Sequence, residues 1–336
     1  MATIHPTPHG ADAESPPDTD SPFHAGEQAM QRHAGMRERT EKIGRKVIRD
    51  FMPEQHRELF ATLPMLILGA LDERQRPRAS VLTGRPGFIN SPDARTLEVA
   101  APASQGHGWR EVLAPGEPVG LLGIELETRR RNRMNGRVIQ AGSAGFTVRV
   151  EQSFGNCPKY IQARRHQFIR DPAAVVTQPP VHGEGPLLSA KAARMIAGAD
   201  TFFIASAFAG PGGGQVDVSH RGGKPGFVRV TSENGRTLLT APDFLGNFHF
   251  ATLGNLLLNP RAGLLFIDFT SGDVLSLSGE ARIIEEGPEV HAFAGAQRLL
   301  QIRVEGGSRI EDAIPLRWSA PVEEPHVLAT GTWVRP

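Results

Sequence analysis

The 336-residue sequence has little of what would place it in several common protein classes. It contains one cysteine, Cys157, so neither an internal disulfide nor a multi-cysteine metal site can form, and a reducing compartment is expected. Its formal net charge of +1 argues against a strongly basic nucleic-acid-binding protein. No apolar run reaches the roughly 20 residues that span a bilayer, and the polar, proline-rich N-terminus is unlike a signal peptide. We therefore expect a cytoplasmic protein without a nucleic-acid or membrane partner.

Glycine and proline, in contrast, are plentiful, with 37 and 27 residues. This turn-rich composition argues against a helical bundle, whereas 39% hydrophobic and 22% charged residues are typical of a globular protein with a core. After Leu63 short β-rich segments alternate with turns, which predicts a mainly β fold with flanking helices, of the α+β class. The strands expected in the first half are 65–70, 78–82, 87–89, 96–100, 119–126, 136–140 and 146–150.

Changes in composition predict the organisation of the chain. Residues 1–22 are polar and expected to be disordered, and 23–53 have the apolar spacing of a helical extension. Residues 54–170 form a first β unit, a linker rich in proline and glycine follows at 171–186, and 187–336 form a second unit. Helices are expected at 54–62, 158–168, 187–197 and 248–258.

The second unit repeats the first. GGKPGFVRV (222–230) matches TGRPGFIN (83–90), RTLLTAP (236–242) matches RTLEVAAP (95–102), and NPRAGLLFIDF (259–269) matches GEPVGLLGIEL (116–126). The matches keep one order at an offset of about 140 residues, far above the 20–50 residues of a solenoid repeat. The pattern predicts a tandem duplication whose halves pack as a pseudo-symmetric pair, like the two subunits of a homodimer. A site at their interface would take different groups from each half.

The second half carries the denser polar and glycine-rich segments. Asp243, Gly246 and Asn247 precede the helix expected at 248–258, and N–H groups at a helix start suit a phosphate. The alternative is that Asp243 and Asn247 are only caps and turn formers. Arg221 and Lys224 either pair with the phosphate or decorate a hairpin.

Four segments carry a family resemblance: RGGKPGFVRV (221–230), TAPDFLGN (240–247), TLGNLLLNPRAGLLFIDF (252–269) and LSGEARI (277–283). They resemble the FMN-binding split-barrel family of pyridoxamine 5′-phosphate oxidase. The resemblance implies two tandem six-stranded antiparallel split β-barrels and FMN as cofactor. The oxidase's Ser-Arg-Lys phosphate triplet is absent, so pyridoxamine phosphate is not implied as substrate. By motif position, and with Arg221 added, the FMN-binding residues of this half would be Arg221, Phe227, Val228, Arg229, Asp243, Asn247, Thr252 and Asn255.

The first half resembles the same family in other parts, TRRRNRMNGRV (128–138) and SFGNCPKYIQARR (153–165). One half thus keeps the phosphate loop and the other keeps the closing segment, which implies a single composite FMN site. The second barrel would hold the phosphate and the first would cover the ring. The resemblance places Arg131, Arg133, Cys157, Lys159 and Tyr160 on the ring side.

Several of these residues have simpler explanations. The arginine cluster at 129–133 is also what a solvated hairpin end looks like, and Cys157 has no assignable His-Asp partner for covalent catalysis. His220 and His249 lack a third ligand at suitable spacing, so no metal site is predicted. His24 and Glu27 either cover the site or only cap a helix.

The sequence thus predicts an FMN-dependent oxidoreductase that acts on an unidentified small molecule, with a nicotinamide nucleotide as a candidate electron donor. No catalytic residue is assigned. The alternatives are a non-catalytic flavin-binding or redox-sensing module, and a split barrel that uses haem or a deazaflavin. Two quaternary arrangements stay open, a homodimer and a monomer with an intrachain pseudo-dimer.

Overall fold

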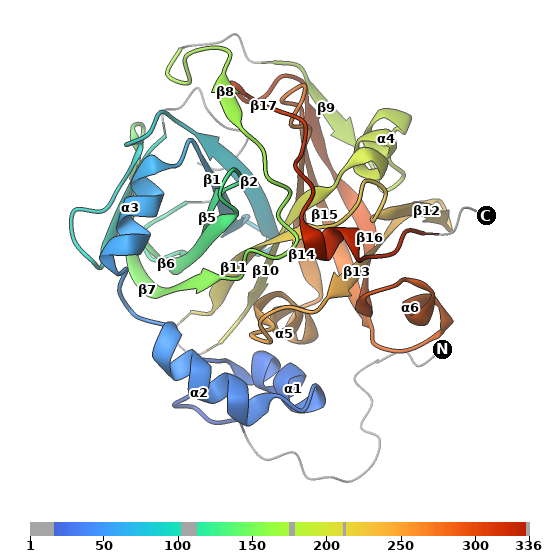
Figure 1. Cartoon of the computed structure of the whole chain (residues 1–336). Helices are drawn as coiled ribbons and strands as arrows, with labels where there is room; N and C mark the ends of the chain where they lie inside the picture. The colour runs from blue at the N-terminus through green and yellow to red at the C-terminus, as the bar shows by residue number, and fades with distance from the viewer. Residues whose placement is uncertain (1–16, 102–112, 175–178, 211–212, 334–336) are drawn as a thin grey trace.

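The protein is built around two antiparallel β-sheets whose strands are arranged in the same order. The computed structural model describes residues 17–101, 113–174, 179–210 and 213–333. The first sheet has the order β2-β1-β5-β6-β7-β4-β3, and the second has the order β11-β10-β14-β15-β16-β13-β12, with β9 added beside β16 (Figure 1). The first sheet comprises β1 (Met65–Leu71), β2 (Pro77–Thr83), β3 (Ile89–Asn90), β4 (Thr96–Ala100), β5 (Pro118–Glu125), β6 (Arg130–Gly142) and β7 (Gly145–Asn156). The second comprises β9 (Val181–Glu184), β10 (Thr201–Phe208), β11 (Gln215–Gly222), β12 (Arg229–Glu233), β13 (Arg236–Phe244), β14 (Arg261–Ile267), β15 (Val274–Ile284) and β16 (Ala296–Ile310).

Helices and one small sheet complete the fold. β8 (His166–Phe168) pairs with β17 (Leu316–Trp318), which joins the end of the first half to the C-terminal part of the chain. The helices are α1 (Ala25–His33), α2 (Arg37–Val47), α3 (Glu54–Thr62), α4 (Ala190–Gly198), α5 (Ala251–Leu258), α6 (Pro288–Ala292) and α7 (Pro325–Leu328). None of the helices within the described ranges has the length and apolar character that crossing a bilayer requires.

The two sheets pack face to face through corresponding strands. β11 lies against β1, β5 and β6, and β2 lies against β10, β14 and β15. Two glycines allow the close approach: a Cβ on Gly120 would lie 2.6 Å from the carbonyl oxygen of Val216, and one on Gly263 would lie 2.4 Å from that of Pro77. These glycines hold matching positions in β5 and β14. Gly120 faces β11 of the second sheet, and Gly263 faces β2 of the first sheet. The interface therefore has an approximate two-fold character.

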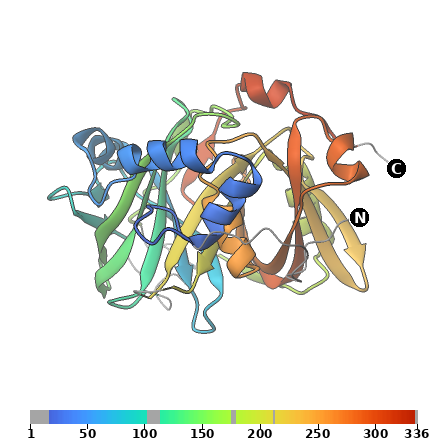
Figure 2. The same ribbon diagram turned by 90° about the horizontal axis from the view of Figure 1, so that it is seen from below.

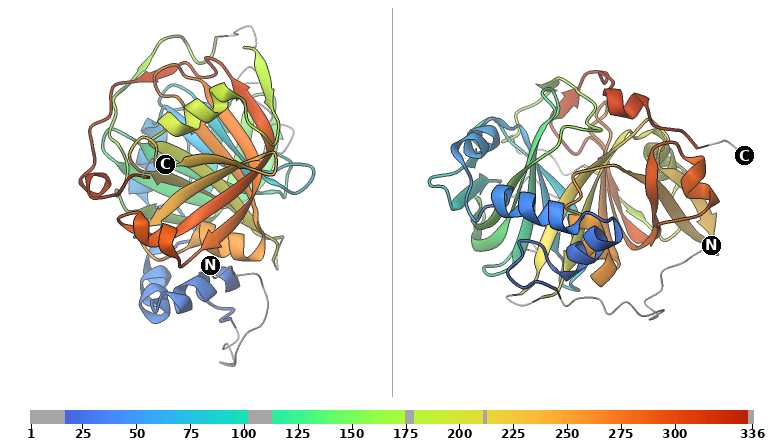
Figure 3. Two further views of the ribbon diagram at one scale, coloured as in Figure 1. Left: turned by 90° about the vertical axis from the view of Figure 1, so that its right-hand side faces the viewer. Right: turned by 60° about the horizontal axis from the view of Figure 1, so that its bottom comes forward.

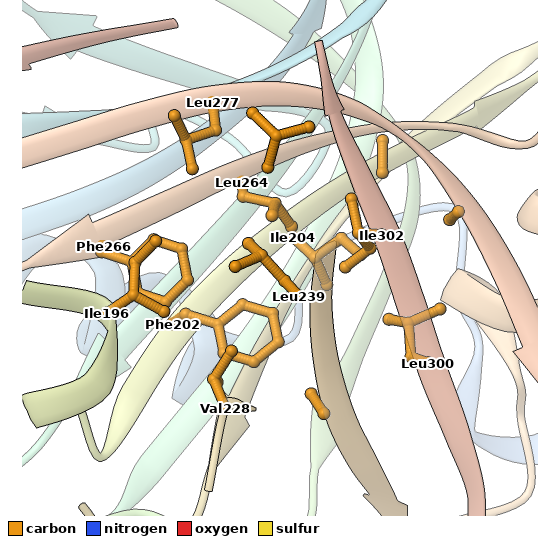
Figure 4. Packing of buried hydrophobic residues seen from close by; sticks show 14 of the residues in the cluster. Ile196, Phe202, Ile204, Val228, Leu239, Leu264, Phe266, Leu277, Leu300 and Ile302 are labelled. Atoms are coloured by element: carbon orange, nitrogen blue, oxygen red, sulfur yellow. The ribbon is translucent and has the colours of Figure 1, made fainter. Parts of the chain in front are cut away.

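Each sheet also has its own hydrophobic core. The core of the second sheet includes Phe202, Leu264 and Ile302, and α4 closes it with Ile196 (Figure 4). Figure 3 shows α4 lying across that sheet. The core of the first sheet is closed in the same way by α3, which contributes Phe60. A third cluster fills the interface between the sheets, so the halves are joined by a continuous apolar layer.

The N-terminal helices lie along one edge of the interface. α1 packs on α5, and the helices meet at Gly26 and Gly254, where a Cβ on Gly26 would lie 2.1 Å from the carbonyl oxygen of Gly254. Figure 2, seen from below, shows α1 and α2 in front of strands from both halves. His24 caps α1, and its partner in the capping box is Glu27. Both residues are thus caps, as the simpler explanation held.

Most strands follow the expected ranges, but one expected helix is wrong and another starts late. Residues 158–168 form an irregular segment that ends in β8, because Tyr160 has a left-handed backbone (φ 64°) and Ala163 pairs with Val322. The helix expected at 248–258 begins only at Ala251, because Phe248 and Phe250 are also left-handed. The sheets have seven and eight strands instead of the six expected for each barrel.

The proposed domain boundaries stay predictions, as does the origin of the two sheets by duplication. Two of the segments are nevertheless more ordered than expected. The linker expected at 171–186 contributes β9 to the second sheet. Of the tail expected at 1–22, residues 1–16 lie outside the described ranges, and Asp18 N–H donates to the side chain of Gln28 (3.0 Å).

Candidate functional site

A polar pocket opens where the two halves meet near the N-terminus of α5. The ends of β6 and β7 line it from the first half, and β11, the end of β13, the loop 245–250 and the first turn of α5 line it from the second. The charged and hydrogen-bonding side chains of the lining are Arg131, Arg133, Asn156, Cys157, Lys159, Tyr160, Ser219, His220, Arg221, Asp243, Asn247, His249, Thr252, Gln297 and Arg298.

Two arginines share one carboxylate on the second-half wall. Asp243 is buried, Arg221 forms a close ion pair with it, and Arg298 donates to its other oxygen (3.0 Å). The guanidinium of Arg298 also lies over the ring of Phe250, 5.1 Å from its centroid. The arrangement leaves one net positive charge and holds both guanidinium groups at the pocket. Asp243 thus enters the site as the group that orients two arginines.

Arg131 and Arg133 bring positive charge from the first half. Arg133 is buried and donates to Asp217 of β11 (2.7 Å), which also accepts from Asn135 (2.8 Å), so its charge is balanced. Arg131 donates instead to the carbonyl oxygen of Cys157 (2.9 Å), to Nδ1 of His220 (2.9 Å) and to Sγ of Cys157 (3.7 Å), and none of these acceptors is a carboxylate. Burial lowers the pKa of Arg131 from its ordinary value, but the group stays a cation at neutral pH.

The histidines of the pocket are held neutral. Burial, with the charges of Arg131, Arg221 and Arg164, lowers the pKa of His220 well below its ordinary value. Because its Nδ1 accepts from Arg131, the proton of the neutral ring resides on Nε2. Burial, with Arg133, lowers the pKa of His249 to about 4. Both rings are therefore neutral at physiological pH.

The pocket wall concentrates unusual backbone conformations. Tyr160, Phe248 and Phe250 all have positive φ values near 60°, a region that bulky side chains seldom occupy. Such residues cluster at functional sites, where the surrounding structure enforces a conformation that costs about 1–3 kcal/mol. Their aromatic rings, with Phe244 stacked on Tyr160 (5.0 Å between centroids), give the pocket flat apolar surfaces beside its cations.

Nine of the thirteen residues expected at the site line this pocket, although they come from two segments, 131–160 and 221–252, that lie in different halves of the chain. The nine are Arg131, Arg133, Cys157, Lys159, Tyr160, Arg221, Asp243, Asn247 and Thr252. Asn247 also forms the turn that the alternative explanation assigned to it, because its Oδ1 accepts from the N–H of His249 (3.1 Å). Lys224 lies outside the lining and donates to the carbonyl oxygen of Thr330 (2.6 Å).

The other four residues lie elsewhere. Phe227 and Val228 are buried in the core of the second sheet. Arg229 pairs with Glu289 (2.9 Å) and lies over the ring of Trp333. Asn255 is fully buried behind the pocket, where it donates to Asp217 (2.8 Å).

Sequence reasoning missed Arg298, Phe154 and Asn156. Arg298 stands directly opposite Asp243 in the β13–β16 pair. The signal was thus a strand register, which the sequence alone does not state. Phe154 and Asn156 end β7, only two residues apart and on the same side of the strand. Among the described residues, no group of three or more His, Cys, Asp and Glu side chains is arranged to hold a metal ion.

No protein-family model matches the sequence, and no curated protein matches it. Solved structures show distant similarity. A protein described as a putative pyridoxamine 5′-phosphate oxidase from Lactobacillus delbrueckii is 15% identical, with a TM-score of 0.26; the match covers 32% of this chain and 95% of that one.

Two other similar structures are a haem-storage protein and an FAD-binding protein. The haem-storage protein HutZ from Vibrio cholerae is 16% identical (36% of this chain, 91% of that one, TM-score 0.24). The FAD-binding protein from Mesorhizobium loti is 15% identical (38% and 97%, TM-score 0.23). Each match covers little more than one third of this chain.

Proposed function

We propose that the two sheets are a tandem pair of split barrels and that the pocket between them binds FMN, making the protein a flavin-dependent oxidoreductase. The observation that carries the proposal is the charge of the pocket. Five cationic side chains and a single carboxylate line it, and Asp217 balances one of the cations. Such a lining favours an anionic ligand, and a phosphate dianion matches its charge.

The residues present fit a flavin nucleotide. Arg221 and Arg298 are positioned to pair with the phosphate, and the start of α5 lies beside them, where N–H groups lack intrahelical acceptors. Arg221 Nε and Asn156 Nδ2 are buried donors without a protein partner. A ligand that accepts from them removes the cost of leaving them unpaired. The rings of Tyr160, Phe248 and Phe250 supply the flat surface that an isoalloxazine requires.

The bound flavin would supply the chemistry of hydride and electron transfer. The chain's own residues would bind it, orient it and set the charge around it. Arg131, whose acceptors include no carboxylate, is the cation available to a carbonyl edge of the ring or to an anionic substrate. A nicotinamide nucleotide stays the proposed electron donor, and the pseudo-dimer within one chain is the proposed assembly.

Haem is the second candidate, because two neutral histidines line the pocket and arginines could pair with its propionates. FMN is favoured because the lining places cations for a phosphate beside aromatic rings for an isoalloxazine. Haem would in addition need one of the two histidines as a ligand to its iron.

Titration of the purified protein with FMN, riboflavin and haemin tests the proposal. FMN should bind much more tightly than riboflavin, since only FMN carries the phosphate. In Arg221→Leu, FMN binding should weaken by about 30-fold, the equivalent of about 2 kcal/mol, while riboflavin binding changes little. Arg236→Leu, at an exposed strand end, is the matched control.

Three results would refute FMN as the ligand: equal affinity for FMN and riboflavin, unchanged FMN binding in Arg221→Leu, or a Soret band from haemin with no flavin binding. Reduction of the bound flavin by NADH or NADPH, followed as bleaching of its absorbance, separates an oxidoreductase from a binding module.

A further inference from the structure

The loop that carries Tyr160 is held by a residue from the far end of the chain. Tyr160 has a left-handed backbone, and its N–H donates to Oε2 of Glu324 (3.1 Å). Glu324 follows β17, 164 residues away in sequence and outside both large sheets. It is itself buried, although it stands in an otherwise exposed segment.

Glu324 is held firmly in this position. Its own N–H donates to Gln162 Oε1 (3.0 Å), its Oε2 accepts from the N–H of Val327 (3.1 Å), and its Oε1 lies 2.7 Å from Nδ1 of His326. Although burial opposes it, these hydrogen bonds keep the pKa of Glu324 below its ordinary value, so the carboxylate is charged at neutral pH. A charged acceptor makes a stronger bond to the Tyr160 N–H than a neutral one.

The Tyr160 side chain uses this conformation to reach the other half of the molecule. Its ring stacks on Phe244, and its hydroxyl donates to the carbonyl oxygen of Leu245 (3.3 Å). Tyr160, Phe244 and Leu245 all line the pocket. A left-handed tyrosine is strained and persists only where its surroundings enforce it.

We infer that Glu324 is a positioning residue of the binding site, which holds Tyr160 in its left-handed conformation and so fixes one wall of the pocket. Only the expected effect of Glu324 on FMN binding rests on the proposed function; its role in holding Tyr160 does not. The C-terminal segment is accordingly part of the site, although none of its side chains between 316 and 333, the last described residue, lines the pocket.

The chain offers two probes for this wall that need no ligand. Tyr160 is the only tyrosine, so tyrosinate absorbance reports on this residue alone. Cys157 is the only cysteine, lies half-buried three residues earlier in the same loop, and can be followed with a thiol reagent. Burial raises the pKa of Tyr160, and the charges of Cys157, Glu324 and Asp243 add to that rise.

The test compares Glu324→Ala and Glu324→Gln with Glu323→Ala, the neighbouring exposed glutamate. In Glu324→Ala, the thiol reagent should modify Cys157 at least threefold faster than in the wild type. The same variant should bind FMN about tenfold more weakly. Glu324→Gln, which retains an oxygen acceptor, should restore both values to within twofold of the wild type. Both Glu324 variants should lower the Tyr160 pKa, since each removes the charge.

Cys157 rates and a Tyr160 titration in Glu324→Ala that match Glu323→Ala would overturn the inference. If Glu324→Ala does not fold, an unchanged Tyr160 pKa in Glu324→Gln would overturn it equally. If the wild-type protein does not bind FMN, the proposed function fails, and the two ligand-free measurements still decide the role of Glu324.

Discussion

The two ends of the interface between the sheets occupy corresponding positions but carry opposite chemistry. We name the end with the pocket the polar end and the other the apolar end. Strand registers relate them: Arg133 stands opposite Leu122 as Ser276 stands opposite Leu265, and Arg131 corresponds in the same way to Val274. These two cationic positions of the polar end thus have a small polar and an apolar counterpart.

The counterparts on the second strand of each sheet differ as strongly. His220 pairs with Phe203 as Val81 pairs with Ile67, so valine replaces the pocket histidine. Asp217, the buried acid of the polar end, corresponds to Arg78, which donates to Ser278 (3.0 Å). Corresponding strand positions therefore carry charged side chains at the polar end and mostly apolar side chains at the apolar end.

The apolar end uses that freedom to extend the core. Val274 and Leu265 pack there with Ile314, Leu316 and Trp318, which belong to the C-terminal part of the chain. Apolar burial of this kind stabilises by roughly 25 cal/mol per Å², whereas the polar end keeps unpaired donors and strained loops. Apolar packing is thus concentrated at one end of the interface, and the charged side chains of the proposed binding site are concentrated at the other.

The largest effect that sharpens this comparison is expected from Leu316→Ala at the apolar end. Leu316 is fully buried in the interface cluster, so the truncation should lower the free energy of unfolding by about 3 kcal/mol. Urea unfolding monitors it, and FMN affinity of the folded protein should stay within twofold. Exposed Leu328→Ala is the control. A loss below 1 kcal/mol would show that this end does not carry the stability assigned to it.

The sequence predicted the strands of the fold better than it predicted the residues around the pocket. Most strands could be predicted because the alternation of side chains and the turn residues act locally. The loop at 157–165 could not be predicted, because a helix start at Pro158 is locally reasonable and a contact with Glu324 overrides it. Arg298 was missed for a similar reason, since only the register of β13 and β16 places it at Asp243. Local sequence patterns thus determine most of the strands, whereas the pocket depends on contacts between residues that are distant in sequence.

A smaller effect concerns pH and is confined to the polar end. The pKa of His249 is about 4 in the folded protein against an ordinary value of 6.5, so folding disfavours its protonation. Its contribution to stability is complete above pH 6.5 and is lost as the pH falls toward 4. Between pH 7 and 5 the wild type should lose about 1–2 kcal/mol more than His249→Phe, which retains the ring packed against Phe23 and Phe154.

Urea unfolding at each pH measures this difference, and His182→Gln, at an exposed position of β9, is the control. Parallel pH profiles of the wild type and His249→Phe would contradict the neutral, buried state of His249.

The smallest effect is expected where a polar contact of the apolar end is removed. Arg78 is partly buried, and across the interface it donates to the hydroxyl of Ser278 (3.0 Å). Burial lowers the pKa of its guanidinium, and the charge of Asp72 offsets only part of that effect. Arg78→Met keeps the length of the side chain and removes the charge. The free energy of unfolding should change by less than about 0.5 kcal/mol, because the lost hydrogen bond and the relieved desolvation offset each other. A loss above 2 kcal/mol would mean that both ends of the interface depend on buried charge, and the division between them would then lie in the ligand-facing arginines alone.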